Sequence, residues 1–295
     1  MKFFPISPYD FARTIQAGRV LSVMTSIVDG AYRRVVRVKD TLVLIEVASE
    51  GTTDAPELEA RILAANSSVD EAALWAKVRR ILNVEADLKP FYALAQADPV
   101  LAQTVTMLYG LHSLQADSLF EALGLTIIEQ QITLKLAQTA ERWLLTWGGE
   151  SLVYEGEIYY AFPRPEQIAA ASVDDLLPLK ITRGRMQRLI DLAQVAETLE
   201  VLRDQPAEIA YETLIGFKGV GHWTAAWTLV RAQGYTTYVG AADVALRAAV
   251  NSYYFGQSGR ADVPIVAETF AQYGKFSGIA AFYTMMRWAA EKYKI

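Results

Sequence analysis

The sequence predicts a mainly α-helical protein with a smaller α+β domain at its N-terminus. In residues 1–88, apolar and polar residues alternate and β-branched side chains are frequent, whereas in residues 89–295 apolar residues recur at helical spacing. The chain has 295 residues, of which 52% are hydrophobic and 21% charged. It is therefore long and apolar enough to bury the cores of two domains.

The α+β domain is predicted from its turns. Turn signals at Asp29-Gly30 and Lys39-Asp40 separate the alternating runs, which is the pattern of an antiparallel meander. Residues 57–67 could form a further strand. After them, Ser68 is followed by Glu71 three residues later, a capping-box pattern that predicts the start of a helix.

The helical region is predicted from apolar periodicity. Residues 117–147 form a long apolar-periodic run, residues 183–202 form a second, and residues 267–293 close the chain with a third. Between the first two runs, Ser172 is a cap residue at which we expect a short helix to begin. From Leu88 onward the chain is thus expected to be almost wholly helical.

The composition excludes several kinds of site. The absence of cysteine excludes disulfides, thiolate metal sites, iron–sulfur clusters and cysteine nucleophiles, and it suits a cytoplasmic protein. Pro5 and Pro8 interrupt the N-terminal residues, which do not resemble a signal peptide, and no run of about 18 apolar residues predicts a membrane span. The net charge of −5 argues against bulk attraction to nucleic acid, but a phosphate-binding face needs only local positive potential.

Two glycines, Gly219 and Gly221, interrupt the apolar sequence "LIGFKGVGHWTAAWTLV" and predict a helical hairpin over residues 214–227. The first helix is expected to end near Gly216 and the second to begin near His222. Glycine permits positive φ and a close approach of backbone N–H groups to a ligand, and free N–H groups at a helix N-terminus bind anions. A nucleic-acid phosphate is the expected occupant, although a plain glycine-capped turn would have the same sequence.

Asp243 is a single acid in the apolar run "YVGAADVALRAAVNSYY". A carboxylate is costly to bury unless it caps a helix or takes part in chemistry. The residues after Asp243 are typical of a helix, so an N-cap role suits it. The two roles are compatible, because an N-cap carboxylate is fixed in position and points outward.

These segments together resemble the helix–hairpin–helix (HhH-GPD) superfamily of DNA glycosylases. In that superfamily, as here, a hairpin of the type "LIGFKGVGHWTA" is followed about twenty residues later by an aspartate that opens a helix. "LFEALGLTIIEQQITLKLA" resembles its I-I-x-Q-Q-V-S helix, and "FPRPEQIAAASVDDLLPLKITRGRMQRLIDLA" resembles its Phe-Pro-x-Pro segment and the basic turn after it. The N-terminal meander is similar to the TBP-like domain of the AlkA-type branch.

The resemblance covers nearly the whole chain and implies a fold and an activity. The fold would be a TBP-like antiparallel sheet domain joined to an HhH-GPD helical bundle, whose two helical subdomains form a cleft. The protein would be a cytoplasmic monomer (nucleoid-associated in a prokaryote) that binds double-stranded DNA with damaged bases. It would flip out an alkylated base and hydrolyse the N-glycosidic bond with no required cofactor. The alternatives are a glycosylase for deaminated or other damaged bases, and a non-catalytic hairpin DNA-binding protein.

The resemblance also assigns residues to the reaction. Asp243 matches the catalytic carboxylate, which stabilises positive charge on the sugar. Trp223 stands where bifunctional members carry a lysine nucleophile, so no lyase step is expected. Trp223, Trp227 and Phe276 would form an aromatic pocket for an electron-poor alkylated base, unless they are ordinary core residues. An isolated acid among apolar residues argues against the purely binding alternative.

The remaining assignments concern DNA binding. Gly219 and Gly221 would hold a phosphate, and the basic stretch "KITRGRMQR" adds local positive charge. Gln131 matches the residue that fills the gap left by the flipped base, although a solvent-facing glutamine would have the same sequence context. Further DNA contacts are expected from Lys218, His222, Arg183 and Arg185, and the backbone carbonyls of Ile215, Phe217 and Val220 match a monovalent-cation site.

Overall fold

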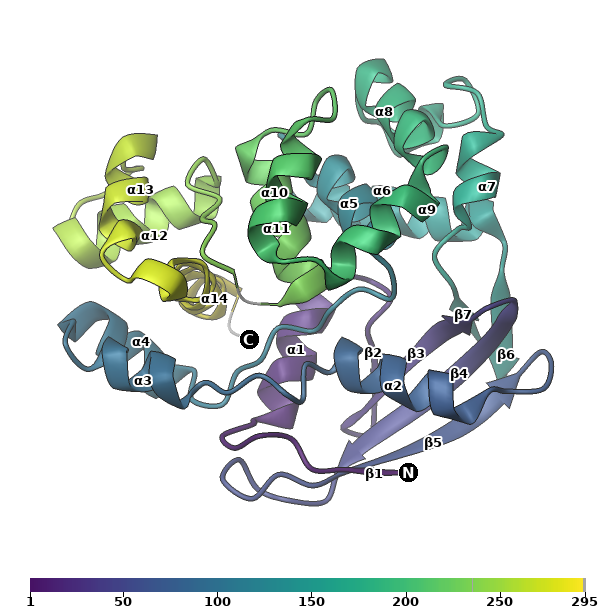
Figure 1. Ribbon diagram of the computed structural model, residues 1–295, viewed down its shortest axis with the longest axis horizontal. Coiled ribbons are helices and arrows are strands. Elements are labelled where there is room, and N and C mark those ends of the chain that lie inside the picture. Colours follow the sequence, from purple (N-terminus) through teal and green to yellow (C-terminus); the bar gives the residue numbers. More distant parts are fainter. Residues whose placement is uncertain (235, 294–295) are drawn as a thin grey trace.

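An antiparallel sheet occupies one end of the computed structural model, and helices form most of the rest (Figure 1). The structure describes residues 1–234 and 236–293. The strand order is β1-β5-β4-β3-β2, and each neighbouring pair is antiparallel. The strands are β1 (Lys2–Phe3), β2 (Ser26–Val28), β3 (Ala31–Val38), β4 (Thr41–Ser49) and β5 (Leu58–Ala65).

The predicted meander is confirmed, including both turns. Asp29 and Gly30 have φ of 50° and 80° between β2 and β3, and Lys39 has φ of 55° between β3 and β4. These left-handed values match the right-handed twist of the flanking strands, so that two-residue loops suffice. The further strand predicted within residues 57–67 is β5.

Two helices pack on one face of this sheet and share an apolar core with it. They are α1 (Phe11–Leu21) and α2 (Glu71–Ile81). The sequence pattern predicts α2 but not α1. The capping box predicted for α2 is wrong: the side chain of Asp70, not Ser68, accepts a hydrogen bond from the amide of Ala73 at 3.1 Å. Asp70 takes this role because it directly precedes the first helical turn.

A two-stranded hairpin packs on the opposite face of the sheet. It consists of β6 (Ser151–Tyr154) and β7 (Glu157–Tyr160). Leu152 of the hairpin is buried with Val35 and Leu44 of the sheet, whose neighbours in the strands face α1 and α2. The expectation of an almost wholly helical chain after residue 88 is wrong for these two strands. Their turn, Glu155-Gly156, has φ of 53° and 83°, which is a hairpin geometry.

The remaining helices form two apolar clusters, and α11 (His222–Gln233) contributes one face to each. The first cluster contains α5 (Leu119–Glu129), α6 (Leu134–Gly148), α7 (Pro165–Ala169), η1 (Leu177–Leu179), α8 (Arg183–Ala193), α9 (Ala196–Glu200), η2 (Val201–Asp204) and α10 (Ala207–Ile215). The second contains α3 (Lys89–Ala95), α4 (Pro99–Met107), α12 (Val244–Phe255), α13 (Val263–Ala271), η3 (Gly274–Phe276) and α14 (Ser277–Tyr293). Figure 1 shows the two groups on either side of α11. α3 and α4 thus pack with the C-terminal helices rather than with the sheet.

Two of the predicted helical runs are interrupted. The run over residues 117–147 divides into α5 and α6, because Gln131 has φ of 54° and cannot continue a helix. The run over residues 183–202 divides into α8 and α9. The helix predicted to begin at Ser172 is instead a turn, in which Ser172 and Asp175 exchange hydrogen bonds, and η1 follows it.

Within residues 1–234 and 236–293, no helix combines the length and the apolar composition needed to cross a membrane. The same part of the chain contains no group of three or more His, Asp or Glu side chains placed to hold a metal ion.

Candidate active site

The predicted helical hairpin is formed by α10 and α11, joined by residues 216–221. Gly219 has φ of 80° and therefore needs the conformational freedom of glycine. Gly221 instead has an extended backbone and is the N-cap of α11, where no side chain caps the helix. A Cβ added to Gly221 would meet nothing within 4 Å. The first N–H groups of α11 thus lie uncapped at an open surface, which is an arrangement that binds anions.

The loop between α5 and α6 is hydrogen-bonded to this hairpin. The side-chain amide of Gln130 donates to Thr224 Oγ1 at 2.8 Å. Arg188 donates from Nε to Lys218 O at 3.0 Å and from Nη1 to Gln130 Oε1 at 3.3 Å. Gln131, the next residue of the loop, is exposed. The hairpin and the loop that presents Gln131 are therefore one hydrogen-bonded unit.

The basic residues expected at the DNA differ in exposure. Lys218 and Arg183 are exposed, and Arg183 forms an ion pair with Asp174. Arg185 is buried, with only 8% of its surface exposed, and its guanidinium donates to the carbonyl oxygen of Gln130. The structure thus does not leave Arg185 on the surface but uses it to hold the end of α5. Sequence reasoning missed Gln130, for which the doubled glutamine at the end of a helix is the available signal.

Asp243 is half-buried and is the N-cap of α12, as its sequence context predicts. Its Oδ1 accepts hydrogen bonds from the amides of Ala245 at 2.8 Å and Leu246 at 3.0 Å. Its Oδ2 accepts from the indole Nε1 of Trp223 at 3.2 Å. These three N–H donors fix the orientation of the carboxylate and connect it directly to the hairpin.

The two tryptophans of α11 have different surroundings. A Cβ built on Gly240, in the loop before Asp243, would lie 2.8 Å from Trp227 Nε1 and 3.2 Å from Trp223 Cδ1, so both rings pack against this loop. Trp227 is buried, and its Nε1 has no hydrogen-bond partner among the described residues. Trp223 is half-buried. Trp223 is therefore the ring in contact with the carboxylate, and Trp227 belongs to the core beneath it.

Phe276 lies in η3, in the same apolar cluster as Trp223. Its ring centroid is 6.2 Å from that of Phe91 in α3, and the ammonium of Lys275 lies 5.1 Å from the ring centroid. The structure thus places Phe276 against the same apolar cluster as Trp223, on a different element. Its ring contacts are with Phe91 and Lys275.

Other groups predicted at the hairpin are engaged within the protein. Both ring nitrogens of His222 face hydrogen-bond partners. The carbonyl oxygen of Phe217 accepts from the amide of Val220 at 3.0 Å, and Ile215 is the last residue of α10. A carbonyl oxygen has a second lone pair, so Phe217 retains the capacity to bind a cation.

Gly240→Ala is expected to lower the free energy of unfolding by about 1–3 kcal/mol, because the added methyl group overlaps the rings of Trp223 and Trp227. Urea denaturation measures the change. Gly184→Ala is the matched control, since a Cβ at that exposed position of α8 would meet nothing within 4 Å. The control is expected to be neutral or to stabilise the protein by up to about 1 kcal/mol. Equal stability of the two variants would contradict the close packing of Gly240.

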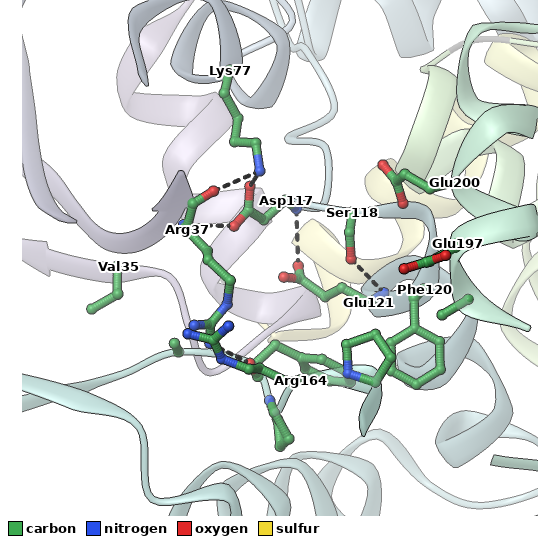
Figure 2. A pocket seen from close by; sticks show the side chains of 15 residues that line it. Val35, Arg37, Lys77, Asp117, Ser118, Phe120, Glu121, Arg164, Glu197 and Glu200 are labelled. Carbon is green, nitrogen blue, oxygen red and sulfur yellow. Dashed lines mark hydrogen bonds and ion pairs between the residues drawn. The ribbon is translucent and has the colours of Figure 1, made fainter. Parts of the chain in front are cut away.

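A cavity of about 280 Å³ lies between the sheet domain and α5. Figure 2 shows the side chains that line it. Asp117 in its wall accepts from the amide of Arg37 at 2.9 Å and pairs with Lys77 at 2.8 Å. Burial raises the pKa of Asp117, but the charges of Lys77 and Arg34 lower it by more, so the net pKa lies below its usual range. None of the residues that line this cavity belongs to the hairpin or to α12. Its charged groups connect the sheet domain to the helices.

Two family models match the chain. The model of the HhH-GPD superfamily base excision DNA repair protein matches residues 125–271, and the model of the AlkA N-terminal domain matches residues 6–113. The first match contains the hairpin and Asp243. The second contains strands β2 to β5 of the sheet and the two helices packed on it.

Individual proteins are similar in sequence and in structure. The DNA-3-methyladenine glycosylase of Bacillus subtilis (strain 168) is 32% identical over 168 residues, which are 56% of this chain and 55% of that protein. DNA-3-methyladenine glycosylase 2 of Escherichia coli (strain K12) is 37% identical over 75 residues, 25% of this chain and 27% of that protein. The chain thus spans about half the length, or less, of these curated relatives. The 3-methyladenine DNA-glycosylase structure from Archaeoglobus fulgidus has a TM-score of 0.84 at 24% identity, covers 97% of both chains, and shares the fold.

Proposed function

The chain belongs to the HhH-GPD superfamily of base excision DNA repair proteins and to its AlkA type, and on this premise we propose that it is a DNA glycosylase for alkylated bases. The enzyme flips an alkylated base out of double-stranded DNA and hydrolyses its N-glycosidic bond, leaving an abasic site. One observation carries the proposal: the carboxylate of Asp243 is anchored both by the amides of α12 and by Trp223 of the hairpin helix.

Asp243 is the catalytic carboxylate of this proposal. When the N-glycosidic bond breaks, positive charge develops on the sugar, and a fixed carboxylate stabilises it. Oδ1 accepts both N-cap amides of α12, whereas Oδ2 accepts one hydrogen bond, from Trp223. Oδ2 therefore retains a lone pair with which to face the sugar or to orient the attacking water.

The hairpin holds the DNA backbone. The uncapped start of α11, with Gly219 and Gly221 before it, supplies N–H groups to a phosphate without regard to sequence. The exposed side chain of Lys218 adds positive charge at the hairpin, and Arg183 at the start of α8 contacts the DNA by exchanging its ion pair with Asp174 for a phosphate. A monovalent cation held by the backbone carbonyls of Ile215, Phe217 and Val220 would reduce the charge repulsion between hairpin carbonyls and phosphate.

Gln131 fills the gap that the flipped base leaves. Its left-handed backbone and exposed side chain place it at the tip of the loop between α5 and α6. Gln130 and Arg188 attach that loop to the hairpin, and Arg185 holds it through the Gln130 carbonyl. Arg185 thus supports DNA binding indirectly in this proposal. An amide at the tip pairs with the orphaned base as well as filling space.

The aromatic side chains provide the surface for the extruded base. Trp223 is half-buried beside Asp243, and Phe276 is half-buried in the same apolar cluster. Alkylated purines are cationic and electron-poor, so they stack favourably on such rings. In this proposal the enzyme acts as a monomer, since one chain supplies the hairpin, the loop at Gln131 and Asp243. A DNA substrate suits the expected cytoplasmic location, associated with the nucleoid if the source is a prokaryote.

The substrate class is tested by base release. From duplex DNA treated with a methylating agent, the protein is expected to release 3-methyladenine or 7-methylguanine, which chromatography of the released bases detects. Duplexes with a single deaminated or oxidised base are expected to keep that base. If the protein released bases from those duplexes alone, it would instead be a glycosylase for deaminated or other damaged bases. Release from none of them, together with DNA binding, would support the non-catalytic alternative.

The absence of a lyase step is tested by borohydride trapping on a duplex with an abasic site. Because Trp223 has no nucleophilic amine, no Schiff base forms at this position and no covalent adduct is expected after electrophoresis. A bifunctional glycosylase treated in parallel shows that the trapping works. A covalent adduct of this protein would contradict the monofunctional mechanism.

A further inference from the structure

We propose that His222 is a positioning residue, which ties the hairpin to the loop that carries Asp243, and not a ligand of the DNA phosphate. The proposal deepens the proposed function and rests on it, because it assigns His222 to the placement of the catalytic carboxylate. It differs from the sequence-based expectation that His222 contacts DNA. The contacts of the imidazole ring are the reason.

Both ring nitrogens of His222 are occupied by partners within the protein. Nε2 lies 2.7 Å from the carbonyl oxygen of Val239, and Nδ1 lies 2.5 Å from the hydroxyl of Tyr211. A carbonyl oxygen only accepts hydrogen bonds, so Nε2 carries the proton and donates, and Nδ1 accepts from the Tyr211 hydroxyl. With both ring nitrogens engaged in this way, the ring has no N–H group left to offer a phosphate.

The two partners of His222, Tyr211 and Val239, are also connected to each other through Tyr238. Tyr211 is in α10, and its ring is stacked on that of Tyr238 with a centroid distance of 3.8 Å and an interplanar angle of 6°. Tyr238 directly precedes Val239, the residue that His222 binds. The start of the Asp243 loop is therefore held from two sides, by a ring stack to α10 and by a hydrogen bond to α11.

The path from this anchor to the carboxylate is short. The carbonyl oxygen of Val239 also accepts from the amide of Ala241 at 2.8 Å, and that of Gly240 accepts from the amide of Asp243 at 2.8 Å. These bonds make residues 239–243 a tight, hydrogen-bonded turn. A displacement of the Val239 backbone is therefore transmitted to Asp243.

Consecutive residues of α11 thus hold two parts of the same loop. His222 binds its backbone at Val239, and Trp223 binds the side chain of Asp243 at its other end. The N-terminus of α11, which holds the phosphate in the proposed function, is the same helical turn. DNA bound at the hairpin and the carboxylate that acts on the sugar are consequently positioned by one element, and a small misplacement of a catalytic group lowers the rate of a reaction strongly.

His222→Ala is the primary test. The variant is expected to exchange the backbone amides of residues 239–243 faster, as measured by hydrogen–deuterium exchange with mass spectrometry. At saturating methylated DNA, its single-turnover rate of base release is expected to fall on the order of 10-fold. Its Kd for a duplex with an abasic-site analogue, and the dependence of that Kd on salt, are expected to stay at the wild-type values.

Three further variants and one control variant separate positioning from a general loss of structure. His222→Gln keeps an N–H donor near the position of Nε2 and is expected to restore most of the rate, whereas His222→Asn, which is too short to reach Val239, is not. Tyr211→Phe removes the hydroxyl but keeps the ring stack, so a smaller loss is expected. Thr213→Ala is the matched control on α10, because its hydroxyl bonds to the carbonyl of Ile209 within the same helix at 2.8 Å.

A different pattern would overturn the proposal. A phosphate ligand lost in His222→Ala would weaken DNA binding and reduce the slope of log Kd against log salt concentration by about 0.9, with unchanged exchange of residues 239–243. If His222→Ala does not fold, His222→Gln and Tyr211→Phe decide by the same two measurements.

Failure of this proposal can be distinguished from failure of the proposed function, because hydrogen exchange does not depend on catalysis. A wild-type protein that releases no base would therefore overturn the proposed function, while the exchange of residues 239–243 would still decide whether His222 holds the loop.

Discussion

Asp243→Asn is expected to release alkylated bases at least about 100-fold more slowly than the wild type and to bind DNA with similar affinity. The amide keeps the shape of the carboxylate, and its oxygen can still accept from Ala245 and Leu246. The negative charge is lost, however, and with it the stabilisation of positive charge on the sugar. The new NH₂ group also faces the indole N–H of Trp223, which loses its acceptor. Single-turnover release of 7-methylguanine measures the rate, and fluorescence anisotropy measures the affinity.

Asp262→Asn is the matched control for this experiment. Asp262 is also an N-cap aspartate, at the start of α13, but it is exposed and its side chain makes no cap hydrogen bond. The control variant is expected to keep the wild-type rate. If Asp243→Asn also kept that rate, the carboxylate would be a helix cap without a catalytic role.

Glu141→Gln is expected to stabilise the protein progressively more as the pH rises. The difference in the free energy of unfolding between variant and wild type should grow by about 3 kcal/mol between pH 4.5 and pH 8. Glu141 is buried in α6, and burial raises its pKa from 4.5 to about 7. Its two oxygens accept hydrogen bonds from Ser22 Oγ at 2.5 Å and from the amide of Val23 at 3.1 Å.

The direction follows from proton binding by Glu141. Between pH 4.5 and 7 the folded protein holds a proton on Glu141 that the unfolded chain has lost, so the stability of the wild type falls as the pH rises. Above this window both states are ionised and the loss is complete. Glutamine does not titrate. The hydroxyl of Ser22 can rotate to accept from the new amide while the amide of Val23 donates to its oxygen, so both hydrogen bonds persist.

The difference between the two proteins is the quantity to measure, by urea denaturation from about pH 4.5 to about pH 8. His112 changes the stability in the opposite sense, because burial lowers its pKa from 6.5 to about 4. Its contribution is present above pH 6.5 and is lost as the pH falls toward 4. His112 is present in both proteins, so this effect cancels. A difference that did not change with pH would show that Glu141 ionises as readily in the folded protein as in the unfolded chain.

Several elements could be predicted because their signals are local. The hairpin turn between Gly216 and His222 and the N-cap at Asp243 depend on the conformational preferences of a few adjacent residues. The two meander turns, at Asp29-Gly30 and Lys39-Asp40, are of the same kind. A missed signal of this kind is the Glu155-Gly156 turn, which joins β6 and β7 inside a region read as helix.

Other features had a weak local signal or none. The apolar periodicity of residues 117–147 continues through Gln131 and hides the break between α5 and α6, for which the local signal is Thr133, the N-cap of α6. The positive charge of Arg185 suggests a surface residue, yet its guanidinium is buried against the end of α5. For His222, the sequence shows an exposed hairpin position but not the two groups that occupy its ring.

The hairpin, the acid that opens a helix and the family resemblance that both carry can be predicted from the sequence alone, because they reside in short motifs whose backbone preferences act within a few residues. Which groups meet depends on the tertiary structure. Trp223 and Asp243 are 20 residues apart in the chain, His222 and Val239 are 17 apart, and Arg185 and Gln130 are 55 apart. Their contacts depend on the packing of α11 between two apolar clusters, and burial of side chains across the whole molecule sets that packing.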